Sequence, residues 1–321
     1  MLFRSHGKLM ITGEYLVLAG ARCLAMPVCF GQSMHVQRTA HGGGLQLEWI
    51  SRVRGAQWLH VVFTGPEWRI DHKPGSGELP GNKVSDRQMA SARFIRSVLQ
   101  AAQSCSGDFL SGGGGWRVVS ELDFDLSWGL GSSSSLISNI AWWADISPFE
   151  LFFKTSGGSA YDIACARSHQ PILFTYKGRH RLPDFQPVMF NPPFSDKLVF
   201  VYSGNKQSSA ESLMGFDPRS VNREQRRMIS SISERMCVTG SLQEFMQAMH
   251  HHEAITAGVL KKNPVQPDRF DDFPGAIKSL GAWGGDFLLA ASDRPQEETI
   301  AYFRQRRHDP IIPFNDMIQS S

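Results

Sequence analysis

The chain of 321 residues is longer than one hydrophobic core usually supports, so its length predicts two domains. Its composition, with 41% hydrophobic and 20% charged residues, is that of a globular protein and excludes a disordered or fibrous chain. The formal net charge of +3 is too small to indicate a nucleic-acid-binding protein.

The cysteines and the apolar segments bear on where the protein works. The five cysteines are scattered and odd in number, and none is spaced as Cys-x-x-Cys, which argues against a disulfide framework or a zinc site. No segment approaches the roughly 20 apolar residues of a membrane helix, and charge and glycine interrupt the N-terminal residues before they resemble a signal peptide. We therefore expect a cytoplasmic protein without a membrane partner.

Apolar patterning in the first third of the chain predicts strands and then a helix. Short apolar runs separated by glycines predict a strand-rich start over residues 9–30, and alternating apolar and polar residues extend it through 45–49 and 60–63. Apolar residues at helical spacing predict a helix over 85–103. Four consecutive glycines at 112–115 indicate a flexible loop.

A glycine- and serine-rich segment, Gly129 to Ser135, lies between a strand-like run and a helical pattern. A helix N-terminus exposes unpaired N–H groups with partial positive charge, and glycines let a phosphate approach them closely. No Lys-Ser or Lys-Thr follows the glycines, so the segment is not a Walker A loop, and it lacks the Rossmann spacing. Alone, it indicates a phosphate site and a serine-capped structural helix about equally.

The prolines after Asn191 mark the best candidate for a domain boundary, which divides the chain into residues 1–190 and 191–321. Beyond it, apolar spacing predicts two helices and a buried strand, over residues 223–236, 242–260 and 287–291. The consecutive histidines at 250–252 point around a helix and do not converge on one ion, which favours a partly exposed helix over a metal site.

Three separated segments stand out along the chain: Gly7–Gly20, Trp128–Ser135 and Lys278–Asp286. In sequence and in order they resemble the three motifs of the GHMP kinases, a superfamily named for galactokinase, homoserine kinase, mevalonate kinase and phosphomevalonate kinase. The resemblance spans nearly the whole chain. It implies an α+β fold with a ribosomal protein S5 domain 2-like N-terminal domain over residues 1–190, a ferredoxin-like C-terminal domain over 191–321, and ATP bound between them.

Within the superfamily, Gly13-Glu14-Tyr15, Ser159 to Ala164 and Gly284-Gly285-Asp286 look closest to phosphomevalonate kinases and to a less characterised group with a Gly-Tyr-Asp-Ile-Ala signature. The chain departs from these patterns at two positions. Ala160 replaces the glycine of that signature, and Trp283 stands where most members have a small glycine. The tryptophan leaves the fit of the ligand open.

The resemblance also implies roles for individual residues. Asp162 resembles the catalytic aspartate that accepts or orients the substrate hydroxyl proton, and Lys8 resembles the motif-one lysine beside it. Glu14 is expected to brace Lys8 or a backbone turn. The residues implied in nucleotide binding are Gly129, Leu130, Gly131, Ser132, Ser133, Ser134, Gly281, Gly284 and Gly285.

Magnesium would be held by Ser133, which resembles the metal-binding serine of mevalonate kinases, and by Glu150, which lies near the position of the usual carboxylate. Each residue has a structural alternative. Ser133 is also explained as a helix cap, and Glu150 equally well as a solvated acid at a helix start.

The function implied is an ATP- and Mg²⁺-dependent kinase of mevalonate or 5-phosphomevalonate, acting as a monomer or homodimer without nucleic acid. A kinase of another small alcohol, such as a sugar or homoserine, remains open. A related diphosphomevalonate decarboxylase is a second alternative, which Lys8 disfavours. A third is a catalytically silent ligand sensor, which the retention of Lys8, Ser133 and Asp162 disfavours. An S5-like domain also makes RNA binding a candidate function, but the chain lacks the interleaved aromatic and basic residues that such binding needs.

Overall fold

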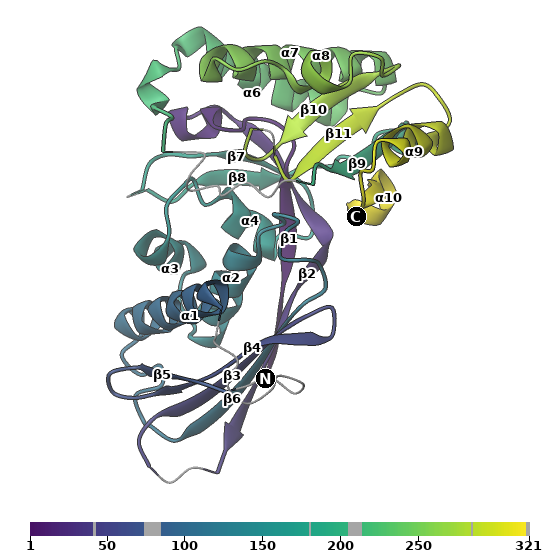
Figure 1. The fold of residues 1–321 in the computed structure, drawn as a ribbon. Helices are drawn as coiled ribbons and strands as arrows, with labels where there is room; N and C mark the ends of the chain where they lie inside the picture. The colour runs from purple at the N-terminus through teal and green to yellow at the C-terminus, as the bar shows by residue number, and fades with distance from the viewer. Residues whose placement is uncertain (41–42, 74–84, 180, 205–213, 284, 319–321) are drawn as a thin grey trace. The chain divides into compact units, whose positions relative to one another are not determined.

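The structure is a computed structural model that describes residues 1–40, 43–73, 85–179, 181–204, 214–283 and 285–318 (Figure 1). Contacts divide the chain into two compact units, which interleave along the sequence. Unit 1 comprises Met1–His6, Phe30–Leu126 and Gly131–Gly157, and unit 2 comprises Gly7–Cys29, Ser127–Leu130 and Gly158–Ser321. A single boundary between residues 190 and 191 stays a prediction.

Two long strands, β1 (Leu2–Met10) and β2 (Cys23–Thr39), pair with each other and contribute residues to both units. In unit 1, residues 32–39 of β2 continue a sheet in the order β5-β4-β3-β6-β2. Its other strands are β3 (Gln46–Val53), β4 (Ala56–Thr64), β5 (Arg69–His72) and β6 (Gly115–Leu122). Only β3 and β6 run parallel among these pairs of described strands. The strands predicted from alternation at 45–49 and 60–63 are confirmed.

The described residues of unit 1 also form three helices, α1 (Asp86–Cys105), α2 (Ser132–Trp143) and α3 (Pro148–Thr155). They pack on one another, and α1 also packs on β4. Ser85 and Gln88 cap each other's backbone N–H at the start of α1, which explains why the helix predicted over 85–103 begins where it does. The side chain of Asn139 joins α2 to β2, because its Nδ2 donates to the carbonyl of Gln32 at 2.9 Å.

Unit 2 contains the short pair β7 (Ile172–Thr175) and β8 (Asp184–Pro187), with β7 antiparallel to residues 23–25 of β2. A second, antiparallel sheet has the order β10-β11-β9-β12. Its strands are β9 (Leu198–Tyr202), β10 (Ala276–Leu280), β11 (Phe287–Ala291) and β12 (Ile311–Pro313). All five residues of β11 are buried, as the continuous apolar run predicts.

The helices among the described residues of unit 2 are α4 (Tyr161–Arg167), α6 (Arg223–Val238), α7 (Leu242–Leu260), α8 (Val265–Arg269), α9 (Gln296–Gln305) and α10 (Phe314–Met317). Short 3₁₀ turns lie at Leu16–Ala19, Ser195–Lys197 and Pro218–Ser220. In Figure 1 helices α6, α7 and α8 lie on one side of β10 and β11, and α7 and α8 contact β10. Helix α9 packs on β9 and β12, and its Phe303 joins a buried core with Val201 and Leu288. The predicted α+β class is confirmed.

The described helices include none that combines the length and apolar character needed to cross a membrane. Helix α7 carries the three consecutive histidines. His250 and His251 are exposed and His252 is buried, so the prediction of a partly exposed helix is confirmed.

Candidate active site

Lys8, in β1, holds the residues that lead into helix α2. Its backbone N–H donates to the carbonyl of Leu130 at 2.9 Å, and its Nζ donates to the carbonyl of Gly129 at 3.0 Å. The side chain of Leu130 is fully buried. Two hydrogen bonds from one residue therefore fix the backbone at positions 129 and 130.

Two aromatic residues of the second sheet hold the start of the same loop. The hydroxyl of Tyr202, at the end of β9, donates to the carbonyl of Ser127 at 3.2 Å. The ring of Trp128 packs edge-on against the ring of Phe287, with 6.2 Å between their centroids. The backbone over residues 127–130 is thus set by packing within unit 2.

Gly129 is required at its position for two reasons. Its φ of +66° lies in the left-handed region, which glycine adopts without strain. A Cβ atom on this residue would overlap the carboxylate of Asp286. The Asp286 side chain therefore lies directly against the glycine-rich loop, in the space that a side chain at position 129 would fill.

The N-terminus of α4 brings Asp162 to the neighbourhood of Lys8. The Nζ of Lys8 lies 5.6 Å from the centre of the Tyr161 ring, and the N–H of Ile163 donates to Oδ1 of Asp162 at 3.1 Å. Burial raises the pKa of the Cys165 thiol well above its usual value, and the charge of Asp162 raises it further whereas that of Lys8 lowers it. Both predicted catalytic charges thus act on one buried thiol.

Ala160 precedes α4 in the left-handed conformation, with a φ of +65°. Alanine adopts this conformation at a cost of about 1 to 2 kcal/mol, which glycine avoids. The residue that replaces the family's glycine thus retains a glycine-like backbone, and the turn into Asp162 is kept despite the substitution.

The serines of the loop divide into structural and accessible ones. Gly131 begins α2 in the left-handed conformation with a φ of +89°, and the hydroxyls of Ser134 and Ser135 each donate to its carbonyl at 3.1 Å. Ser134 is buried, whereas Ser132 is half-buried and Ser133 is exposed. Of the three serines predicted to contact nucleotide, Ser132 and Ser133 thus present themselves at the surface of unit 1.

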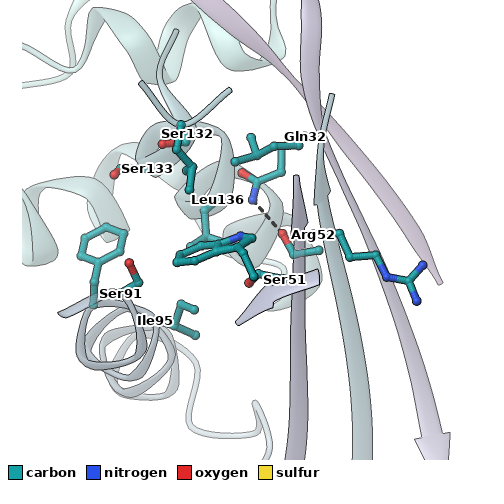
Figure 2. A pocket seen from close by; sticks show the side chains of 13 residues that line it. Gln32, Ser51, Arg52, Ser91, Ile95, Ser132, Ser133 and Leu136 are labelled. Atoms are coloured by element: carbon teal, nitrogen blue, oxygen red, sulfur yellow. Dashed lines mark hydrogen bonds between the residues drawn. The ribbon is translucent and has the colours of Figure 1, made fainter. Parts of the chain in front are cut away.

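Ser132 and Ser133 line a cavity of about 80 Å³ in unit 1 (Figure 2). Helix α1 contributes Ser91, Phe94 and Ile95 to its wall, and strands β2, β3 and β6 contribute among others Gln32, Ser51, Arg52 and Ser120. The indole Nε1 of Trp58, which also lines the cavity, is buried and has no hydrogen-bond partner among the described residues. Because the volume is below the range of about 300–1,000 Å³ for ligand pockets, the cavity suits one part of a ligand.

Glu150 lies in the first turn of α3, where the hydroxyl of Ser147 caps the helix. Its side chain is 53% exposed, and its Oε1 lies 3.3 Å from the Nζ of Lys154. Across the part of the chain that the structure describes, histidine, cysteine and acidic side chains form no cluster of three or more that would hold a metal by itself. The roles of Ser133 and Glu150 as metal ligands stay predictions.

The third motif forms the turn between β10 and β11. Gly281 has a φ of +74°, and a Cβ on Gly285 would overlap the carbonyl oxygens of Leu280 and Ala282, so both positions need glycine. Gly284 lies outside the described residues. The role of these three glycines in nucleotide binding stays a prediction.

The backbone N–H of Trp283 donates to the hydroxyl of Tyr15 at 2.8 Å. Tyr15 belongs to the first motif, is buried, and packs its ring edge-on against Phe216. The first and third motifs are thus joined directly, at the residue that departs from the family pattern.

Comparison with known proteins relates this geometry to solved structures. No family model and no curated protein matches the sequence. Phosphomevalonate kinase of Streptococcus pneumoniae, solved with phosphomevalonate and AMPPNP, matches over 96% of each chain with a TM-score of 0.66 and 14% identity. Mevalonate kinase of Methanococcus jannaschii covers 97% of this chain and 96% of its own, with a TM-score of 0.65 and 13% identity.

Galactokinase of Lactococcus lactis, solved with galactose, matches over 95% of this chain and 87% of its own, with a TM-score of 0.57 and 12% identity. The protein has the GHMP kinase fold. The fold predicted from the three motifs is thereby confirmed, whereas identities of 12–14% leave the substrate undecided. The GHMP kinase fold accommodates both mevalonate-type and sugar substrates among these three structures.

Within the GHMP kinase fold, the first and third motifs also share a buried ionic cluster, here called the Glu14 cluster and composed of Glu14, His252, Glu253 and Lys278. Oε1 of Glu14 lies 2.5 Å from the Nζ of Lys278, and its Oε2 lies 3.2 Å from Nε2 of His252. Glu253 accepts from the N–H and the hydroxyl of Ser279, both at 3.2 Å. All four charged or titratable side chains are buried.

Hydrogen bonding identifies the tautomer of His252. The N–H of Gly13 donates to Nε2 at 2.7 Å, so this nitrogen is an acceptor and the proton of the neutral ring lies on Nδ1, which is 3.5 Å from the hydroxyl of Thr256. An Nε2 without a proton cannot donate to Glu14, whose Oε2 has no hydrogen-bond partner among the described residues. Because the N–H of Gly13 already occupies the lone pair of Nε2, the Glu14 Oε2 and His252 Nε2 atoms face each other without a hydrogen bond.

The pKa values of the cluster agree with that geometry. Burial raises the pKa of Glu14 to about 7, although the charge of Lys278 lowers it. Burial also lowers the pKa of His252 well below its usual value and raises that of Glu253. Near neutral pH the cluster therefore exchanges a proton at Glu14 while His252 stays neutral.

Sequence reasoning missed this cluster. It expected Glu14 to brace Lys8 or a backbone turn, whereas the structure pairs Glu14 with Lys278. A signal was present, because Lys278 is the one charged residue of strand β10 and a buried lysine needs a partner.

Proposed function

We propose that the protein is an ATP-dependent kinase that transfers the γ-phosphoryl group to mevalonate or 5-phosphomevalonate. The observation that carries the proposal is the position of Lys8. Its Nζ donates to Gly129 in the glycine-rich loop and lies over the ring of Tyr161, the neighbour of Asp162. One cation thus serves both the loop proposed for the phosphates and the proposed catalytic carboxylate.

The phosphates of ATP would bind the loop from Gly129 to Ser133 at the N-terminus of α2. A helix of this length presents unpaired N–H groups and partial positive charge at its first turn. The half-buried Ser132 and the exposed Ser133 can add hydroxyl donors, because neither is consumed by the carbonyl of Gly131 in the way that Ser134 is. The positive φ angles at Gly129 and Gly131 keep this backbone open to an anion.

The base of the nucleotide would occupy the cavity behind Ser132. Phe94 and Ile95 supply apolar surface for a planar ring, and Ser91 supplies a hydroxyl. The unpartnered indole N–H of Trp58 would gain an acceptor if a ring nitrogen approached it. These features support a base rather than a phosphate in this cavity.

Asp162 would accept or orient the proton of the attacking substrate hydroxyl. Lys8 would keep the Asp162 carboxylate ionised and lower the pKa of that hydroxyl. A phosphoryl transfer needs little covalent chemistry from the protein, so positioning and charge neutralisation are the main tasks. Asp162 lies in the first turn of α4.

Magnesium would supply charge neutralisation between the phosphates. The donor set fits this ion, because Mg²⁺ is usually held by one or two carboxylates together with substrate phosphates and not by a cage of protein ligands. A hydroxyl at Ser133 and a carboxylate near the loop meet that requirement without the three-residue cluster that the described residues lack.

Mevalonate and 5-phosphomevalonate are proposed as substrates because the Gly13-Glu14-Tyr15 and Gly284-Gly285-Asp286 segments resemble phosphomevalonate kinases. The fold similarity to a phosphomevalonate kinase that was solved with phosphomevalonate supports the same choice. The similarity to a galactokinase keeps sugars in the test.

The test is ADP release from Mg-ATP by the purified chain, measured against mevalonate, 5-phosphomevalonate, homoserine and galactose. We expect turnover with one of the first two and a product heavier by one phosphoryl group in mass spectrometry. Turnover with galactose alone would reject the proposed substrate and keep the kinase. Absence of turnover on the whole panel, by protein that binds nucleotide, would support a ligand sensor instead, and a product lighter by carbon dioxide would indicate a decarboxylase.

A further inference from the structure

Asp286 stands at the end of the third motif with its backbone fixed. Its carbonyl accepts the N–H of Ser203 at 3.0 Å, and the hydroxyl of Ser203 donates to the carbonyl of Gly285. The residue that follows, Phe287, is fully buried and begins β11. The start of a buried strand therefore determines where the Asp286 side chain emerges.

The side chain emerges against the glycine-rich loop. Its carboxylate fills the space in which a Cβ of residue 129 would lie, and the side chain is half-buried. The carbonyl of Gly129 accepts from the Nζ of Lys8, so a negative and a positive side chain both contact this one residue.

A carboxylate at this place has an electrostatic consequence if the loop binds a triphosphate. Like charges a few ångströms apart repel, and they repel more strongly in a partly buried site than in water. A divalent cation between the two would turn this repulsion into attraction. Mg²⁺ commonly takes one protein carboxylate and completes its coordination with phosphate oxygens and water.

Glu150 is less suited to that task in this structure. Its side chain is more than half exposed. Asp286, in contrast, contacts the loop itself.

We propose that Asp286 supplies the carboxylate that binds the divalent cation of the magnesium–nucleotide complex. The inference rests on the proposed function, because it requires a nucleotide on the loop. It predicts that Mg²⁺ binds tightly only together with nucleotide, since one carboxylate and hydroxyls are too few to hold the ion alone.

The test compares the full-length chain with Asp286→Asn and Glu150→Gln in calorimetric titrations with AMPPNP, once with Mg²⁺ and once with EDTA. We expect Asp286→Asn to weaken binding of the magnesium complex roughly 10- to 100-fold and to leave or strengthen metal-free binding. Glu150→Gln tests the competing carboxylate and should weaken binding of the magnesium complex less than Asp286→Asn does. Equal or tighter binding of the magnesium complex by Asp286→Asn, or a loss confined to Glu150→Gln, would overturn the inference.

A metal-substitution experiment separates metal binding from a structural role. Asp286→Cys should bind AMPPNP weakly with Mg²⁺ and regain affinity with Cd²⁺, because a thiolate prefers the softer ion. Failure of Cd²⁺ to restore binding in a variant with an unchanged melting temperature would count against Asp286, and this variant also serves if Asp286→Asn does not fold.

If the unchanged protein binds no AMPPNP with Mg²⁺, the proposed function fails and the inference with it. Normal binding by every variant rejects the inference alone.

Discussion

The carboxylate of Glu14 lies 2.5 Å from the ammonium of Lys278, and both side chains are buried. The pair joins the turn after β1 to strand β10, which lie 264 residues apart in the sequence. The Nζ of Lys278 also donates to the carbonyl of Ser279 at 2.7 Å, so the ammonium has two acceptors in place of water. The pair therefore fixes the first motif against the third.

Replacing Lys278 with Met should destabilise the protein strongly. Removal of one partner leaves the carboxylates of Glu14 and Glu253 buried without a cation, and such losses cost about 3–5 kcal/mol. Urea unfolding followed by circular dichroism would measure the change. Lys262→Met, at an exposed position, is the control and should change the free energy of unfolding by less than about 0.5 kcal/mol.

The double variant Glu14→Gln with Lys278→Met tests the cause. It removes one buried charge together with its partner, so it should recover part of the stability that Lys278→Met loses. If the double variant were no more stable than the single one, the loss would come from packing and not from the unpaired charge.

The stability of the protein should fall as pH rises from about 6.5 to 8. The pKa of Glu14 is raised to about 7 by burial, so the folded chain holds a proton that the unfolded chain has released, and this stabilisation is lost as pH passes through 7. The loss over this interval is on the order of 1 kcal/mol. The raised pKa of Glu253 acts in the same direction.

Below pH 6.5 a second group opposes this effect. Because the pKa of His252 is lowered in the folded chain, the unfolded chain takes up a proton at this residue that the folded chain does not. The free energy of unfolding that His252 contributes therefore falls as pH falls. The free energy of unfolding from urea titrations at pH 5 to 8 should therefore fall as pH rises, by less than the two carboxylates alone would give, because His252 opposes them below pH 6.5. Glu14→Gln should flatten the decline, and an undiminished decline in that variant would refute the role of Glu14.

Local patterns predicted much of the fold, because the features involved are close in sequence. The helix expected over 85–103 is α1 at Asp86–Cys105, and the strand expected over 287–291 has those bounds in the structure. Helical spacing and a continuous buried run depend only on neighbouring residues. The three motifs predicted the GHMP kinase fold because their order reflects the whole chain.

The Glu14 cluster and the contact of Asp286 with Gly129 could not be predicted in the same way. Both join residues that are distant in sequence, and nothing in the pattern around either residue specifies its partner. The roles of Lys8, Asp162 and Ser133 rest on resemblance and stay predictions, although the structure places Lys8 beside Gly129 and Tyr161.

Asp162→Asn should abolish most of the proposed kinase activity while leaving nucleotide binding intact. The amide keeps the size of the side chain but accepts a proton poorly, and loss of general-base catalysis costs about 10²- to 10⁴-fold in rate. The checks are kcat from ADP release and AMPPNP affinity from calorimetry. Asp196→Asn, whose side chain is 69% exposed, is the matched control and should retain full activity. Undiminished kcat in Asp162→Asn would show that another group takes the proton.

Gly129→Ala should impair both folding and nucleotide binding. Alanine is strained by about 1 to 2 kcal/mol at a φ of +66°, and its Cβ would also displace the carboxylate of Asp286. Thermal melting and AMPPNP titration would measure the two effects, with Gly157→Ala as the control because its Cβ would meet no atom within 4 Å. Adding Asp286→Ala to Gly129→Ala removes the overlap with the carboxylate but leaves the backbone strain and a 2.7 Å approach to the Cβ of residue 286, so it should restore part of the melting temperature. An unchanged melting temperature in the Gly129→Ala variant would mean that the carboxylate moves aside without cost and that the loop tolerates a side chain.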